Sequence, residues 1–181
     1  MKRIKYFLIL SALYPLLSIL LGCGYATRAN SSEYKTIYIA PFKNNINIAS
    51  GKSEYARYIT YYPLLESTIT RAVVDRFIFD SNLKIDKEEK SDLVLKGELA
   101  SYDRAALRYA SNNEDVEEYR ITLWVNIALY KKGELVWQKN NFAGDATYFT
   151  TGAQAKSEKS ALDDAIKDLS RRIVETVVEA W

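Results

Sequence analysis

The run from Tyr119 to Tyr130 constrains the fold more than any other part of the chain, because its residues alternate strictly. Every second residue is aliphatic, and polar, aromatic or small residues fill the positions between. Successive side chains of a strand point to opposite faces, so this run predicts a strand with one face in the core. The aliphatic positions are Ile121, Leu123, Val125, Ile127 and Leu129.

The residues after this strand predict a hairpin. Lys131-Lys132-Gly133-Glu134 has the composition of a hairpin turn, and a return strand follows over 135–148. The alternation of that strand changes phase near Asn140 and Asn141, so we expect a bulge there.

Three earlier segments complete the expected sheet. Residues 35–42 predict a first strand, and Leu83 with Ile85 predict a very short one. Residues 92–102 predict a firmer strand, in which Gly97 indicates a bulge or a close backbone approach. The polar, charged segment 103–117 is interpreted as a loop.

Apolar residues at helical spacing predict two long helices, over 62–79 and 157–181. Pro63 suits a first helical turn, with Thr60 as the expected cap. The fold class is therefore α+β: a two-layer sandwich with two long helices packed on one face of a mixed sheet of about four strands. The helical stripes comprise Leu65, Ile69, Ala72, Val73 and Phe77, then Leu162, Ala165, Ile166, Leu169, Ile173 and Val177.

The first 23 residues have the layout of a bacterial lipoprotein export signal. Basic residues precede an apolar run that is short for a membrane span, contains Pro15 and ends in Leu20-Leu21-Gly22-Cys23. That ending resembles the lipobox, which implies cleavage between Gly22 and Cys23 and acyl chains on Cys23. The alternative is an ordinary secretory signal with an incidental cysteine.

These features divide the chain into three parts: a signal peptide over 1–22, a lipidated flexible tether over 23–34 and a single α/β domain over 35–181. The tether begins with Gly24, whereas an Asp after the lipidated cysteine favours inner-membrane retention in enterobacteria. By that analogy we expect a lipid-anchored protein on the periplasmic face of the outer membrane.

Composition argues against catalysis. The chain has no histidine and one cysteine, which excludes histidine-dependent nucleophilic catalysis and the commonest zinc ligand. It has no calcium loop and no Gly-rich phosphate cradle. Removing residues 1–22 leaves 22 basic against 23 acidic residues, which gives no argument for nucleic-acid binding. We therefore expect no enzyme activity, no cofactor and no metal site.

Several segments, in order, resemble the LptE-like lipopolysaccharide-assembly lipoprotein family. The resemblance implies an outer-membrane lipoprotein that plugs and helps assemble an LptD-type β-barrel and assists lipopolysaccharide transport to the outer leaflet. Its partners would be that barrel, lipopolysaccharide and the membrane that holds the acyl chains. The matching segments are Cys23-Gly24-Tyr25, 37–44, 65–73, 92–99, 118–121 and the final helix with Ala161, Asp164, Ala165, Leu169, 172–174 and Trp181.

Two pairs of residues are candidates for contacts with these partners. Family members bind lipopolysaccharide through basic residues, and Arg104 and Arg108 are the candidates here; the alternative is that they are solvated loop charges. Trp124 and Tyr130 fall on the sheet face away from the helices, so we expect a partner to cover them. The aromatics of Tyr102 and Tyr148 are expected beside them, and a terminal tail or the 44–62 loop is the alternative cover.

Two other functions remain open at this point. One is an anchored lipoprotein of the curli-secretion or penicillin-binding-protein-activator type, which also begins with a strand near a Pro-Phe-Asn-like sequence and a helix. The other is a periplasmic hydrolase, which the missing histidine and nucleophile motifs disfavour.

Overall fold

The computed structural model describes residues 34–46, 62–111 and 114–179. All of them belong to one compact unit, Ser32–Trp181. The signal peptide, Cys23 and most of the tether lie outside the described residues, as do Thr60 and Trp181.

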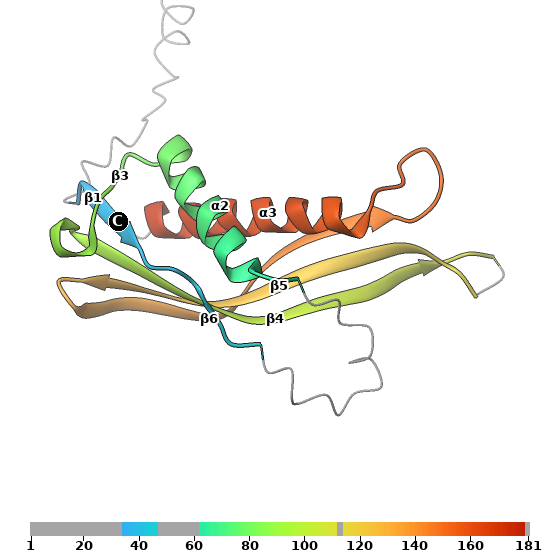
Figure 1. Cartoon of the computed structure of the whole chain (residues 1–181), viewed down its shortest axis with the longest axis horizontal. Coiled ribbons are helices and arrows are strands. Elements are labelled where there is room, and N and C mark those ends of the chain that lie inside the picture. The colour runs from blue at the N-terminus through green and yellow to red at the C-terminus, as the bar shows by residue number, and fades with distance from the viewer. Residues whose placement is uncertain (1–33, 47–61, 112–113, 180–181) are drawn as a thin grey trace, which may run out of the picture. The chain divides into compact units, whose positions relative to one another are not determined.

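Six strands form one mixed sheet, and two long helices pack against it (Figure 1). The strands are β1 (Thr36–Ile39), β2 (Lys43–Asn44), β3 (Lys84–Ile85), β4 (Leu93–Tyr109), β5 (Val116–Lys131) and β6 (Glu134–Phe149). The helices are α2 (Leu65–Asp80), the short 3-10 helix η4 (Glu88–Lys90) and α3 (Glu158–Glu179). The α+β class is confirmed. The sheet has six strands rather than about four, and two of the six, β2 and β3, have only two residues each.

The sheet order is β3-β1-β4-β5-β6, and β2 pairs with β4 beyond the end of β1. β1 runs parallel to β3 and β4, whereas β4, β5 and β6 form an antiparallel meander. The three long strands therefore carry most of the sheet, and the short parallel strands extend it at the β4 edge.

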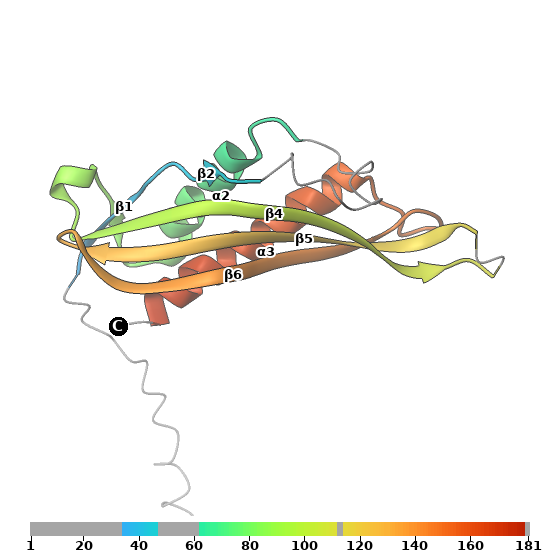
Figure 2. The same ribbon diagram turned by 90° about the horizontal axis from the view of Figure 1, so that it is seen from below.

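Both helices cover the same face of the sheet, and the core lies between the two layers (Figures 1 and 2). Four of the five predicted stripe positions of α2 are buried, namely Leu65, Ile69, Val73 and Phe77, and Ala72 is half-buried. The aliphatic positions of β5 are at most 1% exposed, which confirms the face that the alternation predicted. Helix α2 begins at Leu65, after Pro63 and Leu64, rather than at residue 62.

Two glycines allow other elements to approach the sheet closely. A Cβ on Gly97 would lie 2.2 Å from the ring of Phe42, so the absence of a side chain lets that buried ring cross β4. A Cβ on Gly144 would lie 2.4 Å from Cβ and 2.5 Å from Cα of Leu169 on α3. At Gly97 the close neighbour is the side chain of Phe42 rather than the expected backbone or bulge, whereas at Gly144 it is the backbone of α3.

The prediction of a loop over 103–117 is wrong. β4 continues to Tyr109 and β5 begins at Val116, so much of this segment pairs as an antiparallel arm, residues 105–109 and 116–120. The arm extends past the start of α3 (Figure 2). Register shifts between Leu99 and Ser101 and between Ala106 and Arg108 interrupt the alternation, which explains why the sequence does not read as a strand.

The bulge expected near Asn140 and Asn141 is confirmed. Val125 pairs with Phe142 and Ile127 pairs with Lys139, so two residues of β6 stand opposite Asn126. Asn141 has a positive φ of 52°, and its N–H donates a 3.0 Å hydrogen bond to the side chain of Asn126.

Replacing Gly144 by alanine tests the close contact between α3 and β6. The added Cβ would meet helix backbone, which no rotamer change can move, so we expect a loss of about 1–3 kcal/mol in the free energy of unfolding. Denaturant titration measures this, with exposed Thr147→Ala on the same strand as the control. A Gly144→Ala variant as stable as the wild type would show that the helix is not held this tightly.

Candidate functional site

The sheet face opposite the helices is the first candidate site, because it carries aromatic side chains that the core does not absorb. Trp124 and Tyr130 alternate with the buried aliphatic residues of β5, so both lie on this helix-free face, and both are half-buried. Trp124 Nε1 donates a 2.8 Å hydrogen bond to Asp103 on β4. The ammonium of Lys96 lies 4.9 Å from the ring centroid of Tyr130. Neighbours on the same face thus orient both rings.

A groove of about 760 Å³ lies on the helix-free face, where the segment after β1 passes β4 and β5. Its polar lining mixes phenol, amide, ammonium and carboxylate groups. Several lining residues alternate along their strands with core residues, so their side chains lie on the helix-free face. They are Tyr38, Lys96, Glu98, Asn126, Tyr130 and Gln138.

Tyr102 and Tyr148 do not lie beside Trp124 and Tyr130, so that expectation is wrong. Both are buried on the helix-covered side, with 6% and 5% of their surface exposed. The bulge after Leu99 shifts the phase of β4, and the bulge at 140–141 shifts that of β6. Each shift moves the following side chains to the other face.

The carboxylate of Glu158 joins the first turn of α3 to β4 and to the segment before α2. Its Oε1 accepts hydrogen bonds from the hydroxyls of Tyr62 at 3.0 Å and Tyr102 at 2.9 Å. Its Oε2 pairs with Nη1 of Arg104 at 2.5 Å, and that guanidinium lies 4.8 Å from the ring centroid of Tyr119. The side chain of Glu158 is 20% exposed, so this Glu158 network is largely shielded from water.

The network shifts the titration of its members. Burial disfavours the charge of Glu158, but hydrogen bonds from Tyr102, Tyr62 and Arg104 outweigh it and lower the pKa of Glu158 below 4.5. Burial and the hydrogen bond to Glu158 raise the pKa of Tyr62 to about 12, and the same causes raise the pKa of Tyr102. The ionised carboxylate and neutral phenols therefore coexist across the neutral range.

The two arginines predicted to bind lipopolysaccharide lie on the outer part of β4 rather than in a loop. The charge of Arg104 is already engaged by Glu158. Arg108 lies 3.6 Å from Glu118, its guanidinium is 5.5 Å from the ring centroid of Phe149, and its side chain is 59% exposed. Arg108 is the more accessible of the two cations.

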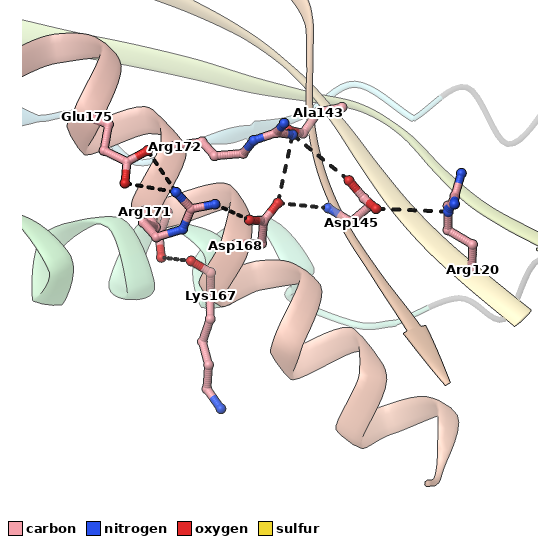
Figure 3. Close-up of polar contacts among 9 residues, drawn as sticks. Arg120, Ala143, Asp145, Lys167, Asp168, Arg171, Arg172 and Glu175 are labelled. Carbon is pink, nitrogen blue, oxygen red and sulfur yellow. Dashed lines mark hydrogen bonds and ion pairs between the residues drawn. The ribbon is translucent and has the colours of Figure 1, made fainter. Parts of the chain in front are cut away.

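A cluster of charges that the sequence does not predict closes part of the β6 edge (Figure 3). Arg172 donates a 2.7 Å hydrogen bond to the carbonyl oxygen of Ala143. The backbone N–H of Asp145 donates to Asp168 at 3.2 Å. These side chains satisfy backbone groups that an open edge would offer to another strand. Only the i, i+3, i+4 spacing of Asp168, Arg171 and Arg172 signals such a cluster.

The described part of the chain offers no cluster of side chains that could hold a metal ion. None of the helices in residues 34–46, 62–111 and 114–179 is long and apolar enough to cross a bilayer.

The fold places the chain in a class of small α+β domains in which two helices cover one face of a mixed sheet. The sequence matches the family model LptE, lipopolysaccharide-assembly, over residues 34–180. The chain belongs to this LptE family. Membership is consistent with a non-enzymatic, membrane-associated lipoprotein.

Solved structures that are similar to this chain have low sequence identity to it. A Xanthomonas campestris protein is 9% identical, with a TM-score of 0.53, 82% of this chain and 89% of that chain covered. Lipoprotein B from Nitrosomonas europaea is 16% identical, with a TM-score of 0.50 and coverage of 80% and 82%. Rare lipoprotein B from Shewanella oneidensis is 16% identical, with a TM-score of 0.45 and coverage of 79% and 92%. The comparison with curated proteins finds no match.

Replacing Glu158 by glutamine tests the Glu158 network. The substitution removes the charge that Arg104 and both phenols meet, so we expect a loss of about 2 kcal/mol in the free energy of unfolding at neutral pH. Because folding lowers the pKa of Glu158, its contribution is present above pH 4.5 and disappears as pH falls through the folded pKa. Denaturant titrations of both proteins at several pH values should therefore converge in acid.

The control is Glu175→Gln, which alters a surface ion pair of α3 with Arg171. We expect it to change the free energy of unfolding by at most about 0.5 kcal/mol. A Glu158→Gln deficit that stays constant into the acid range would mean that its charge is not the cause.

Proposed function

We propose that this chain is an outer-membrane lipoprotein that plugs an LptD-type β-barrel, helps that barrel assemble and assists lipopolysaccharide transport to the outer leaflet. The observation that carries the proposal is the LptE family match, which spans residues 34–180. Acyl chains on Cys23, after cleavage behind Gly22, would hold the protein at the periplasmic face of the membrane.

The helix-free face is the proposed contact with the barrel. The helices cover only the other face, and the helix-free face presents Trp124 and Tyr130 in orientations set by Asp103 and Lys96. Aromatic rings fixed by neighbours lose little conformational entropy when a partner covers them, and such rings are enriched at protein interfaces. This face therefore has the composition and preorganisation of an interface.

Lipopolysaccharide carries phosphate groups, which arginine binds well. Of the two proposed contacts, Arg108 has the more exposed guanidinium, whereas Arg104 would have to leave Glu158 to reach a ligand. Arg108 is thus the better supported candidate.

The family match also weighs against the alternative of a curli-secretion or penicillin-binding-protein-activator lipoprotein. No described feature favours that alternative over barrel assembly.

The double substitution Trp124→Ser and Tyr130→Ser tests the contact face. Removing both rings takes away most of the aromatic area on the helix-free side of β5 while leaving the core untouched, so we expect co-purification of the barrel to fall at least about tenfold. The measurement is the yield of barrel recovered with the tagged lipoprotein from detergent-solubilised outer membranes.

Lys159→Ser, an exposed position on α3, serves as the matched control and should leave the yield unchanged. Circular dichroism and denaturant midpoints establish that the double variant is folded. A folded double variant that recovers as much barrel as the wild type would refute the proposed contact face.

A further inference from the structure

Most of the large apolar side chains that the structure leaves exposed lie at one end of the sheet. Phe79 is 86% exposed and its neighbour Ile78 is 63% exposed, although both belong to a helix whose other face is fully buried. We call the whole group the apolar end. Its members are Ile78, Phe79, Ile85, Leu135, Val136 and Val178.

Contacts between the elements bring these residues to the same end. Helix α2 ends at Asp80 and leads into β3, where the N–H of Lys84 donates a 2.8 Å hydrogen bond to the carbonyl oxygen of Lys35. The β5–β6 turn reaches the same place, because Nζ of Lys131 lies 2.6 Å from the hydroxyl of Tyr34. The last turn of α3 lies toward this end too (Figures 1 and 2).

The same end contains Tyr34, where the described part of the domain begins. Only residues 24–33 separate Tyr34 from Cys23. Even fully extended, that chain reaches at most about 40 Å. β4 has 17 residues, which corresponds to about 55 Å along the sheet. An anchor on Cys23 would therefore hold the apolar end within about 40 Å of the bilayer, whereas the tip of the arm lies about 55 Å further along β4.

We propose that the apolar end docks on the lipid surface beside the anchor. The proposal rests on the acylated Cys23 of the proposed function. Apolar side chains in the interface between headgroups and acyl chains are the usual means by which peripheral proteins lie on a bilayer. Single exposed apolar residues are common, but a group of this size at the point of attachment is not required by the core.

Charge does not select the lipid. The lysines near this end, such as Lys84 and Lys87, alternate with carboxylates such as Asp80, Asp86 and Glu88. The contact is thus apolar, forms on zwitterionic as well as anionic lipid, and resists salt.

An environment-sensitive fluorescent dye, attached at single cysteines, tests whether the apolar end contacts lipid. Cys23 is the only cysteine, and acylation consumes its thiol, so an introduced cysteine is the one site that a thiol-reactive dye can label. Phe79→Cys and Val178→Cys place the dye at the apolar end, and two sites guard against a single variant that fails to fold. Leu107→Cys, also exposed but on the arm, is the matched control.

The full-length lipoprotein, purified in detergent, is reconstituted into phosphatidylcholine and phosphatidylethanolamine vesicles with and without brominated lipid. We expect the dye at Phe79→Cys and Val178→Cys to shift to shorter wavelength and to be quenched by the brominated lipid, at low and high salt alike. We expect neither change at Leu107→Cys.

Each other result contradicts the proposal in a distinguishable way. Protein that floats with the vesicles while the dye at both apolar sites stays in water contradicts the docking and leaves the anchor intact. Wild-type protein that takes the dye at Cys23, or does not float, contradicts the anchor itself. A dye shielded only when the barrel is reconstituted too would assign the apolar end to a protein contact instead.

Discussion

The packing of α3 against β5 and β6 is the contact on which the rest of the structure depends. Gly144 permits it, because the helix backbone at Leu169 lies where a side chain on that strand would be. Once α3 is seated and α2 lies beside it, one face of the sheet is the core and the other has no helix over it. The distinction between the core face and the proposed contact face follows from this asymmetry.

The asymmetry also explains how polar groups are distributed. Glu158, at the first turn of α3, ties the helix to Arg104 and Tyr102 on β4, so the sheet stays held where it passes beyond the helix into the arm. At the middle of α3, Arg172 and Asp168 satisfy the edge of β6. The domain thus closes part of its edge to strand pairing and leaves a face of the sheet for contact, which favours a partner that covers a surface.

Simple periodicity predicted the parts of the fold in which burial alternates without interruption. The aliphatic positions of β5, the stripe of α3 and most of the α2 stripe are buried as expected, and the phase change at Asn140 marks a true bulge. Segment 103–117 does not have a strand pattern in the sequence because bulges interrupt the alternation of β4. Tyr102 was placed on the wrong face for the same reason, since one inserted residue after Leu99 reverses the sides.

The sequence located part of the candidate site and missed another part. Trp124 and Tyr130 could be assigned to the helix-free face because their strand is regular. The Glu158 network was not predictable, since it joins residues 62, 102, 104 and 158, whose proximity depends on the tertiary packing. The apolar end likewise depends on tertiary packing, which brings α2 and β3 together with β6 and α3.

Site-specific photo-crosslinking in growing cells tests the central claim, that the helix-free face meets a β-barrel, most directly. A photoreactive residue at Ala128, between Trp124 and Tyr130 on that face, should crosslink to one large outer-membrane β-barrel protein, whereas the same residue at Lys159 on the outer side of α3 should crosslink to it far less. Crosslinks to the barrel from Lys159 but not from Ala128 would contradict the account.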